Sequence, residues 1–114
     1  MTPLNVFVTE GNIEIYLSRL YATWEPETRD GLLRLVSQEE GRMGARREHL
    51  ENGERRVAQG RELLERQHLA VAQLSEEERG ASLEARLLET MEKVQALLEQ
   101  HLELLQKKFD QTRL

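Results

Sequence analysis

The chain has 114 residues, of which 39% are hydrophobic, 32% are charged and only 4% are aromatic, and its formal net charge is −5 at pH 7. This length fits a single domain, and the high charged fraction favours long, solvent-exposed helices over a thick globular core. Because the chain contains no cysteine, disulfides, thiolate catalysis and cysteine-based metal sites are excluded.

Residues 1–8 include a short β-prone run, Leu4–Val8, which we expect to form an extended arm. An isolated strand is not stable, so the arm would pair with a partner or stay loose. The segment lacks the basic region and the apolar core of a secretory signal. Since no run approaches the roughly 20 apolar residues that span a bilayer, we expect a cytoplasmic protein.

Residues 9–23 predict a short helix with Thr9 at its N-cap, and Pro26 favours its end by biasing Glu25 away from the helical region. Tyr16 and Tyr21 lie along this helix and Trp24 follows its end. These three aromatic residues either pack the helix onto the next one or form a surface for a partner. The sequence leaves both interpretations open.

An apolar heptad repeat runs through the middle of the chain and predicts one long helix over residues 26–74. Pro26 suits the first turn of this helix, and no proline follows it. A seven-residue repeat keeps one side of a helix against a partner helix, as in a coiled coil. The repeat consists of Val36, Met43, Leu50, Val57, Leu64 and Val71.

Gly53 and Gly60 lie seven residues apart, on the stripe three positions after the repeat residues. A glycine inside a helix costs about 0.5–1 kcal/mol relative to alanine. The two glycines either allow a second helix to approach closely or are points of local weakness. Substitution by alanine separates these readings, because it destabilises a close contact and stabilises an exposed weak point.

Residues 81–112 predict a C-terminal helix folded back antiparallel on the long helix. Two serines can cap its start: Ser75 opens a capping-box pattern, and Ser82 follows Gly80. We favour a break between Leu74 and Ala81. The apolar stripe of this helix is broad enough to pack against two neighbours, and it comprises Leu83, Leu87, Met91, Val94, Leu98, His101, Leu105 and Phe109.

The predicted fold is therefore all-α and forms a single domain over residues 1–114, with a coiled-coil hairpin and a short N-terminal helix. Two thin helices bury little apolar area, so we expect hairpins from two copies to pair into a homodimer with a four-helix arrangement. The residues expected in the interaction seam are Val36, Met43, Leu50, Val57, Leu64, Val71, Leu87, Met91, Val94, Leu98 and Leu105.

The sequence predicts no catalytic, cofactor or metal site. Glu65 and His68 form one Glu-x-x-His step, but di-iron sites in helical bundles need two such steps and two further carboxylates. His49 and His68 would lie about 28 Å apart along one helix, so they cannot share a metal within one chain. We expect His49 and His68 to be exposed and His101 to lie at the seam, which leaves open only a metal site between chains.

The charged residues of the middle segment indicate a solvated helix surface. Glu39 and Glu40 are adjacent and point about 100° apart, so we expect them to be solvated or ion-paired. Residues 41–74 carry seven arginines interleaved with five glutamates, whereas nucleic-acid binding needs a clustered, uncompensated patch. The arginines are Arg42, Arg46, Arg47, Arg55, Arg56, Arg61 and Arg66.

We expect a structural or regulatory protein-interaction module, a coiled-coil adaptor without catalytic activity, cofactor or membrane anchor. Its expected partners are a second copy of the chain and another protein of unknown identity. The alternative is a nucleic-acid-associated regulator that uses the arginines of residues 42–66. Arginine supplies all but three of the 16 basic residues, which is typical of proteins from GC-rich bacterial genomes.

Overall fold

A computed structural model of the chain describes the backbone of residues 3–42, 46–79 and 82–112 and the side chains of residues 7–42, 46–78 and 82–111. These residues form helices and no strands, which confirms the all-α class. None of the described helices combines the length and the apolar character needed to cross a membrane. The helices are α1 (Pro3–Leu20), α2 (Pro26–Gly41), α3 (Arg47–Ala72), α4 (Glu76–Arg79) and α5 (Leu83–Thr112).

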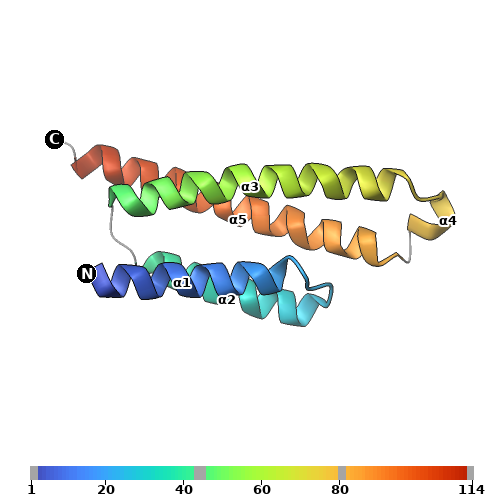
Figure 1. The fold of residues 1–114 in the computed structure, drawn as a ribbon, viewed down its shortest axis with the longest axis horizontal. Coiled ribbons are helices and arrows are strands. Elements are labelled where there is room, and N and C mark those ends of the chain that lie inside the picture. Colours follow the sequence, from blue (N-terminus) through green and yellow to red (C-terminus); the bar gives the residue numbers. More distant parts are fainter. Residues whose placement is uncertain (1–2, 43–45, 80–81, 113–114) are drawn as a thin grey trace.

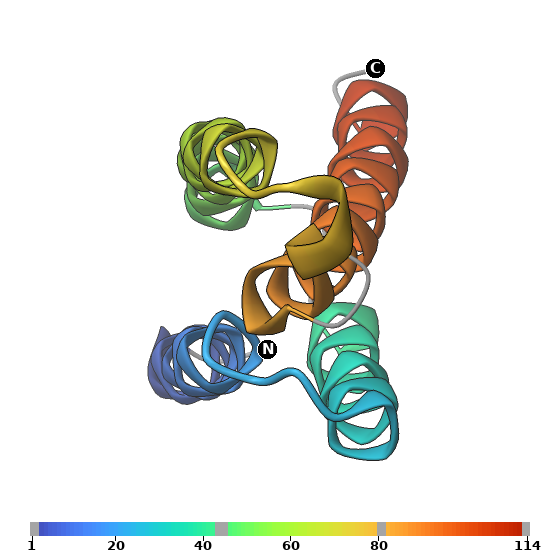
Figure 2. The same cartoon turned by 90° about the vertical axis from the view of Figure 1, so that its right-hand side faces the viewer.

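The helices form two stacked antiparallel hairpins. The shorter hairpin is α1–α2 and the longer one is α3–α5, with α4 at its turn (Figure 1). An end-on view shows α1 below α3 and α2 below the C-terminal part of α5, whose N-terminal part slants toward the middle of the bundle (Figure 2). The longer hairpin extends past the shorter one at the α4 end, and the molecule measures 55 × 24 × 16 Å.

The hydrophobic core lies where the two hairpins meet, and all four long helices contribute to it. Its residues recur at helical spacing, so each helix turns one apolar side inward. Burying these sides against several neighbours supplies the apolar area that two helices alone lack. The core cluster consists of Ile13, Leu17, Leu20, Leu32, Val36, Val57, Val94 and Leu98.

The long helix expected over residues 26–74 is divided in the structure. Its first part, α2, ends at Gly41, and α3 begins at Arg47 and runs in the opposite direction. A heptad repeat predicts which side of a helix is apolar. It does not predict whether the helix is continuous, because the spacing is the same when the chain reverses between two of the repeat residues. The reversal lets Val36 on α2 and Val57 on α3 enter one core. A four-helix arrangement therefore forms within a single chain.

The extended arm expected over residues 1–8 is also corrected, because α1 already begins at Pro3. Proline is well tolerated in the first turn of a helix, and β-propensity is easily overridden by tertiary context. Thr9 consequently lies inside α1 and is buried, where we expected an N-cap. The helix ends at Leu20, three residues before the expected end.

Both candidate serines cap a helix in the turn that precedes α5. The Ser75 hydroxyl accepts a hydrogen bond from the Glu78 backbone N–H at 3.3 Å, and the Glu78 carboxylate accepts one from the Ser75 backbone N–H at 3.3 Å. This reciprocal pair is a capping box for the short helix α4. The Ser82 hydroxyl accepts a hydrogen bond from the Ala85 backbone N–H at 3.1 Å and so caps α5.

The two glycines of α3 differ in their surroundings. A Cβ atom built on Gly60 would overlap Gln95 Oε1 and lie 3.1 Å from Gln95 Cδ. Gln95 is buried and held in place, because its amide donates a hydrogen bond to the Val57 carbonyl at 3.0 Å. Gly60 therefore allows α5 to approach α3 closely. A Cβ on Gly53 would meet Leu102 at an ordinary 3.5 Å, so Gly53 has no such role.

Candidate functional site

The interior of the bundle contains a histidine held between two carboxylates. His49 lies in the first turn of α3, and its side chain is only 1% exposed. Its Nδ1 atom lies 2.6 Å from Glu10 Oε1 on α1, and its Nε2 atom lies 3.0 Å from Glu40 Oε2 on α2. One imidazole thus joins three helices.

A buried arginine continues the same cluster seven residues further along α3. The Arg56 guanidinium pairs with the second oxygen of Glu10, and its Nε donates a hydrogen bond to Glu14 Oε1 at 3.0 Å. The Arg56 side chain is 2% exposed. We call these five residues, Glu10, Glu14, Glu40, His49 and Arg56, the buried polar cluster; the Glu14 side chain, at its edge, is 52% exposed. It fastens α1 and the end of α2 to α3.

The charges of this cluster support one another. Burial lowers the pKa of His49, but the hydrogen bonds and charges of Glu10 and Glu40 outweigh burial and raise it from 6.5 to about 9. Burial raises the pKa of Glu10, but His49 and Arg56 outweigh it and leave a net lowered value. At neutral pH His49 is therefore an imidazolium that donates from both nitrogens, and it has no lone pair with which to act as a base.

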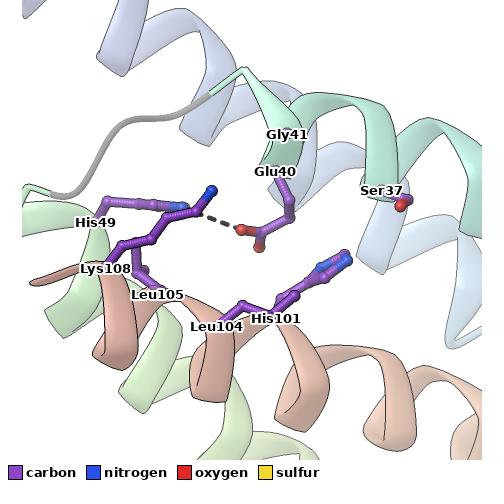
Figure 3. Close-up of a pocket in the computed structure, with 8 residues that line it drawn as sticks. All are labelled: Ser37, Glu40, Gly41, His49, His101, Leu104, Leu105 and Lys108. Atoms are coloured by element: carbon purple, nitrogen blue, oxygen red, sulfur yellow. Dashed lines mark ion pairs between the residues drawn. The ribbon is translucent and has the colours of Figure 1, made fainter. Parts of the chain in front are cut away.

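A cavity of about 180 Å³ adjoins the cluster between α2 and α5 (Figure 3). Glu40, His101 and Lys108 line it together with leucines of α5. Burial lowers the pKa of His101, as does the nearby positive charge of His49, although Glu40 opposes them. The volume is below the roughly 300–1,000 Å³ of typical small-molecule sites. It is also only a few times the roughly 30 Å³ that one water molecule occupies.

The buried polar cluster was not predicted from the sequence, and the expectation that His49 is exposed is wrong. Its partner Glu10 lies 39 residues away in the chain, so no local pattern links them. One usable signal is the seven-residue spacing of His49 and Arg56, which marks a polar stripe beside the apolar repeat. His68 is exposed, as expected, and so is Glu65. No group of residues that could hold a metal ion occurs in the described part of the chain.

The residues expected in the interaction seam lie within the single chain, and Met43 falls outside the described residues. They belong to the bundle interior and leave little surface for a partner. Val36, Val57, Val94, Leu98 and Leu105 are buried. Leu50, Leu64, Val71, Leu87 and Met91 are half-buried.

The aromatic residues proposed as a partner surface are divided between core and surface. Tyr16 and Tyr21 are half-buried and pack against the core cluster. Trp24 is 40% exposed in the turn between α1 and α2, and the Arg86 guanidinium lies 5.3 Å from its ring centroid. This cation–π contact ties the turn to α5.

An exposed apolar surface appears on α1, on the side that faces away from the core. Phe7 is 77% exposed, Val8 49% and Ile15 51%, and a Cβ on Gly11 would meet no atom within 4 Å. At about 100° per residue these positions share one side of the helix, together with Ser18. We call Phe7, Val8, Gly11, Ile15 and Ser18 the outer α1 face.

Comparisons of the chain with protein-family models, with curated proteins and with solved structures find no match. The two features of the structure that bear on function are the buried polar cluster and the outer α1 face.

Proposed function

We propose that the chain is a non-catalytic protein-interaction module, an adaptor that docks a protein on the outer α1 face. The observation that carries this proposal is the exposure of Phe7, Val8 and Ile15 on one side of one helix. Single exposed apolar residues are ordinary, whereas a contiguous apolar patch on a small domain marks an interaction site. Among the described α1 residues, the exposed charged side chains of Glu14 and Arg19 flank this face on its two edges.

The rest of the molecule supports this role by holding α1 in place. The buried polar cluster fixes α1 to α3 through Glu10 and Glu14, and the core residues of α1 pack into the same junction. A docking surface on a rigid helix loses little conformational entropy when a partner binds. The proposal therefore assigns the heptad seam to the internal frame and α1 to recognition, with cytoplasmic location kept as part of the proposal.

Several arginines needed by the nucleic-acid alternative are engaged within the chain. Arg56 is buried and paired with two glutamates. Arg42 lies 3.3 Å from Glu39, and Arg61 lies 3.1 Å from Glu99. A phosphate-binding surface requires clustered, uncompensated positive charge. We therefore propose the interaction module alone.

A charge placed on the outer α1 face tests the proposal. Ile15→Glu introduces a carboxylate among the exposed apolar side chains, and Leu69→Glu is the matched control, since Leu69 is 62% exposed on the outer side of α3. The tagged variants are isolated gently from the native host and their complexes are weighed by native mass spectrometry. We expect wild type and Leu69→Glu to carry a bound protein, a second copy included, and Ile15→Glu to carry none.

Circular dichroism must show that all three proteins are folded. A folded Ile15→Glu variant that keeps the same complexes as wild type would remove the outer α1 face from consideration. A wild-type protein that carries no second chain would contradict the proposal as a whole.

A further inference from the structure

Two apolar residues of the outer α1 face, Val8 and Ile15, are placed symmetrically about Gly11 and Asn12. Val8 lies three residues before Gly11, and Ile15 lies four residues after it. A two-fold axis that passes between residues 11 and 12 therefore exchanges the positions of Val8 and Ile15. A helix with this spacing is complementary to its own copy in an antiparallel pair, as a two-fold interface requires.

Resting on the proposed function, we infer that the protein docked on the outer α1 face is a second copy of this chain. The two α1 helices run antiparallel and cross at Gly11. Val8 of each copy packs against Ile15 of the other. Because the space above Gly11 is open, the two backbones can approach closely there. Two four-helix units thus join through their shorter hairpins, and the longer hairpins point outward.

The exposed apolar area of α1 reaches the lower limit for such a dimer. Taking roughly 150–200 Å² for a fully exposed large side chain, Phe7, Val8 and Ile15 expose roughly 250–350 Å² per copy, since they are 77%, 49% and 51% exposed. Non-polar atoms supply about 57% of a typical interface, so two copies correspond to roughly 900–1,200 Å² of total interface. Specific interfaces begin at about 1,000 Å².

The charges on α1 do not oppose self-association. Glu10 is turned toward α3, where His49 and Arg56 compensate it. Glu14 lies at the edge of the face and is 52% exposed, and its carboxylate is paired with Arg56 at 3.0 Å. In the proposed register the two copies of Arg19 lie about 22 Å apart along the helix pair, at 1.5 Å per residue. At physiological ionic strength the Debye length is about 8 Å, so their repulsion is largely screened.

The chain contains no cysteine, so introduced cysteines report this geometry directly. The double variant Val8→Cys/Ile15→Cys places two thiols opposite two thiols across the proposed axis. Within one helix these positions lie about 10 Å apart, too far for a disulfide, whose Cα atoms lie within about 7 Å. Any disulfide in this variant is therefore intermolecular.

The two single variants are matched controls. Each single cysteine lies about 10 Å along the helix pair from its own copy and should not cross-link. Gly11→Cys lies next to the axis and should cross-link, whereas Ser18→Cys lies about 20 Å from its copy and should not. The readouts are the fraction of covalent dimer after mild oxidation and the mass of the unmodified protein by sedimentation across a concentration series.

Dimeric wild-type protein with cross-links in the double variant and in Gly11→Cys supports the inference. A wild-type protein that stays monomeric across the series, or cross-linking that is equal in Ser18→Cys and Gly11→Cys, overturns it. The proposed function fails separately, because it requires only that Ile15→Glu abolish binding of some protein. A monomeric chain whose Ile15→Glu variant loses a different protein refutes the second copy and retains the docking surface.

Discussion

The charge on His49 should make the stability of this protein depend on pH in a way that a single substitution removes. Both imidazole nitrogens lie against carboxylates, at 2.6 Å from Glu10 and 3.0 Å from Glu40. In His49→Gln the side chain can still donate a hydrogen bond, but it carries no charge. The variant therefore removes the electrostatic part of the contact and leaves a polar group of similar size.

The magnitude follows from the pKa of His49, which folding raises from 6.5 to about 9. At 1.36 kcal/mol per pKa unit, this shift corresponds to about 3 kcal/mol of folding free energy. Below pH 6.5 both folded and unfolded chains carry the proton, so the contribution is fully present. As pH rises toward 9 the unfolded chain releases its proton while the folded chain keeps it, and the contribution is lost.

The acidic side of the profile has the opposite sign. Folding lowers the pKa of Glu10, so its contribution is present above the unfolded value of 4.5 and is lost as pH falls below it. The stabilising contributions of His49 and Glu10 are therefore both fully present between about pH 4.5 and pH 6.5. His49 loses its contribution above this range, and Glu10 loses its contribution below it.

Urea unfolding followed by circular dichroism, at a series of pH values from 5 to 9.5, measures this dependence. The quantity of interest is the difference in unfolding free energy between wild type and His49→Gln, because the ionisations of groups that do not interact with His49 cancel in it. We expect this difference to be largest near pH 6 and to shrink by about 3 kcal/mol toward pH 9.5. A difference that stays constant over the whole range would refute the reasoning that His49 is a buried imidazolium.

Four further substitutions test the packing and the polar contacts. Gly60→Ala should destabilise the protein by about 1–3 kcal/mol through overpacking against α5, whereas Gly53→Ala should stabilise it by about 0.5–1 kcal/mol; equal effects in urea unfolding would show that the two glycines have the same surroundings. Arg56→Met removes the buried cation that pairs with Glu10 and leaves His49 as the remaining cationic partner of Glu10, so it should cost about 3 kcal/mol; a loss within 0.5 kcal/mol in thermal unfolding, as expected of an ordinary surface site, would contradict the burial of this pair. Ser75→Ala removes the capping box and should cost about 1 kcal/mol locally; unchanged backbone chemical shifts in α4 would show that the cap is not needed.

The periodicity of apolar residues predicted the all-α class because helical spacing follows directly from the sequence. The same spacing identified inward positions such as Val36, Val57 and Val94, which are buried. It could not predict the reversal after Gly41, because a heptad repeat is preserved whether the chain continues or folds back. It also could not separate Gly53 from Gly60, since their difference depends on Gln95 of another helix.

The buried polar cluster escaped prediction for a related reason. His49 and Glu10 become neighbours only when two hairpins stack, so their contact is a property of the tertiary arrangement. On a sequence basis a lone histidine among glutamates and arginines is expected at the surface. The outer α1 face was missed because the β-prone residues at its start suggested an extended arm, whereas the structure makes them part of a helix.

The central claim is that the outer α1 face binds a second copy of the chain. Sedimentation velocity of wild type, Ile15→Glu and the control Leu69→Glu, at matched concentrations, tests it most directly. We expect dimers for wild type and Leu69→Glu and a folded monomer for Ile15→Glu. A dimer that survives Ile15→Glu unchanged, or a wild-type protein that sediments only as a monomer, would contradict it.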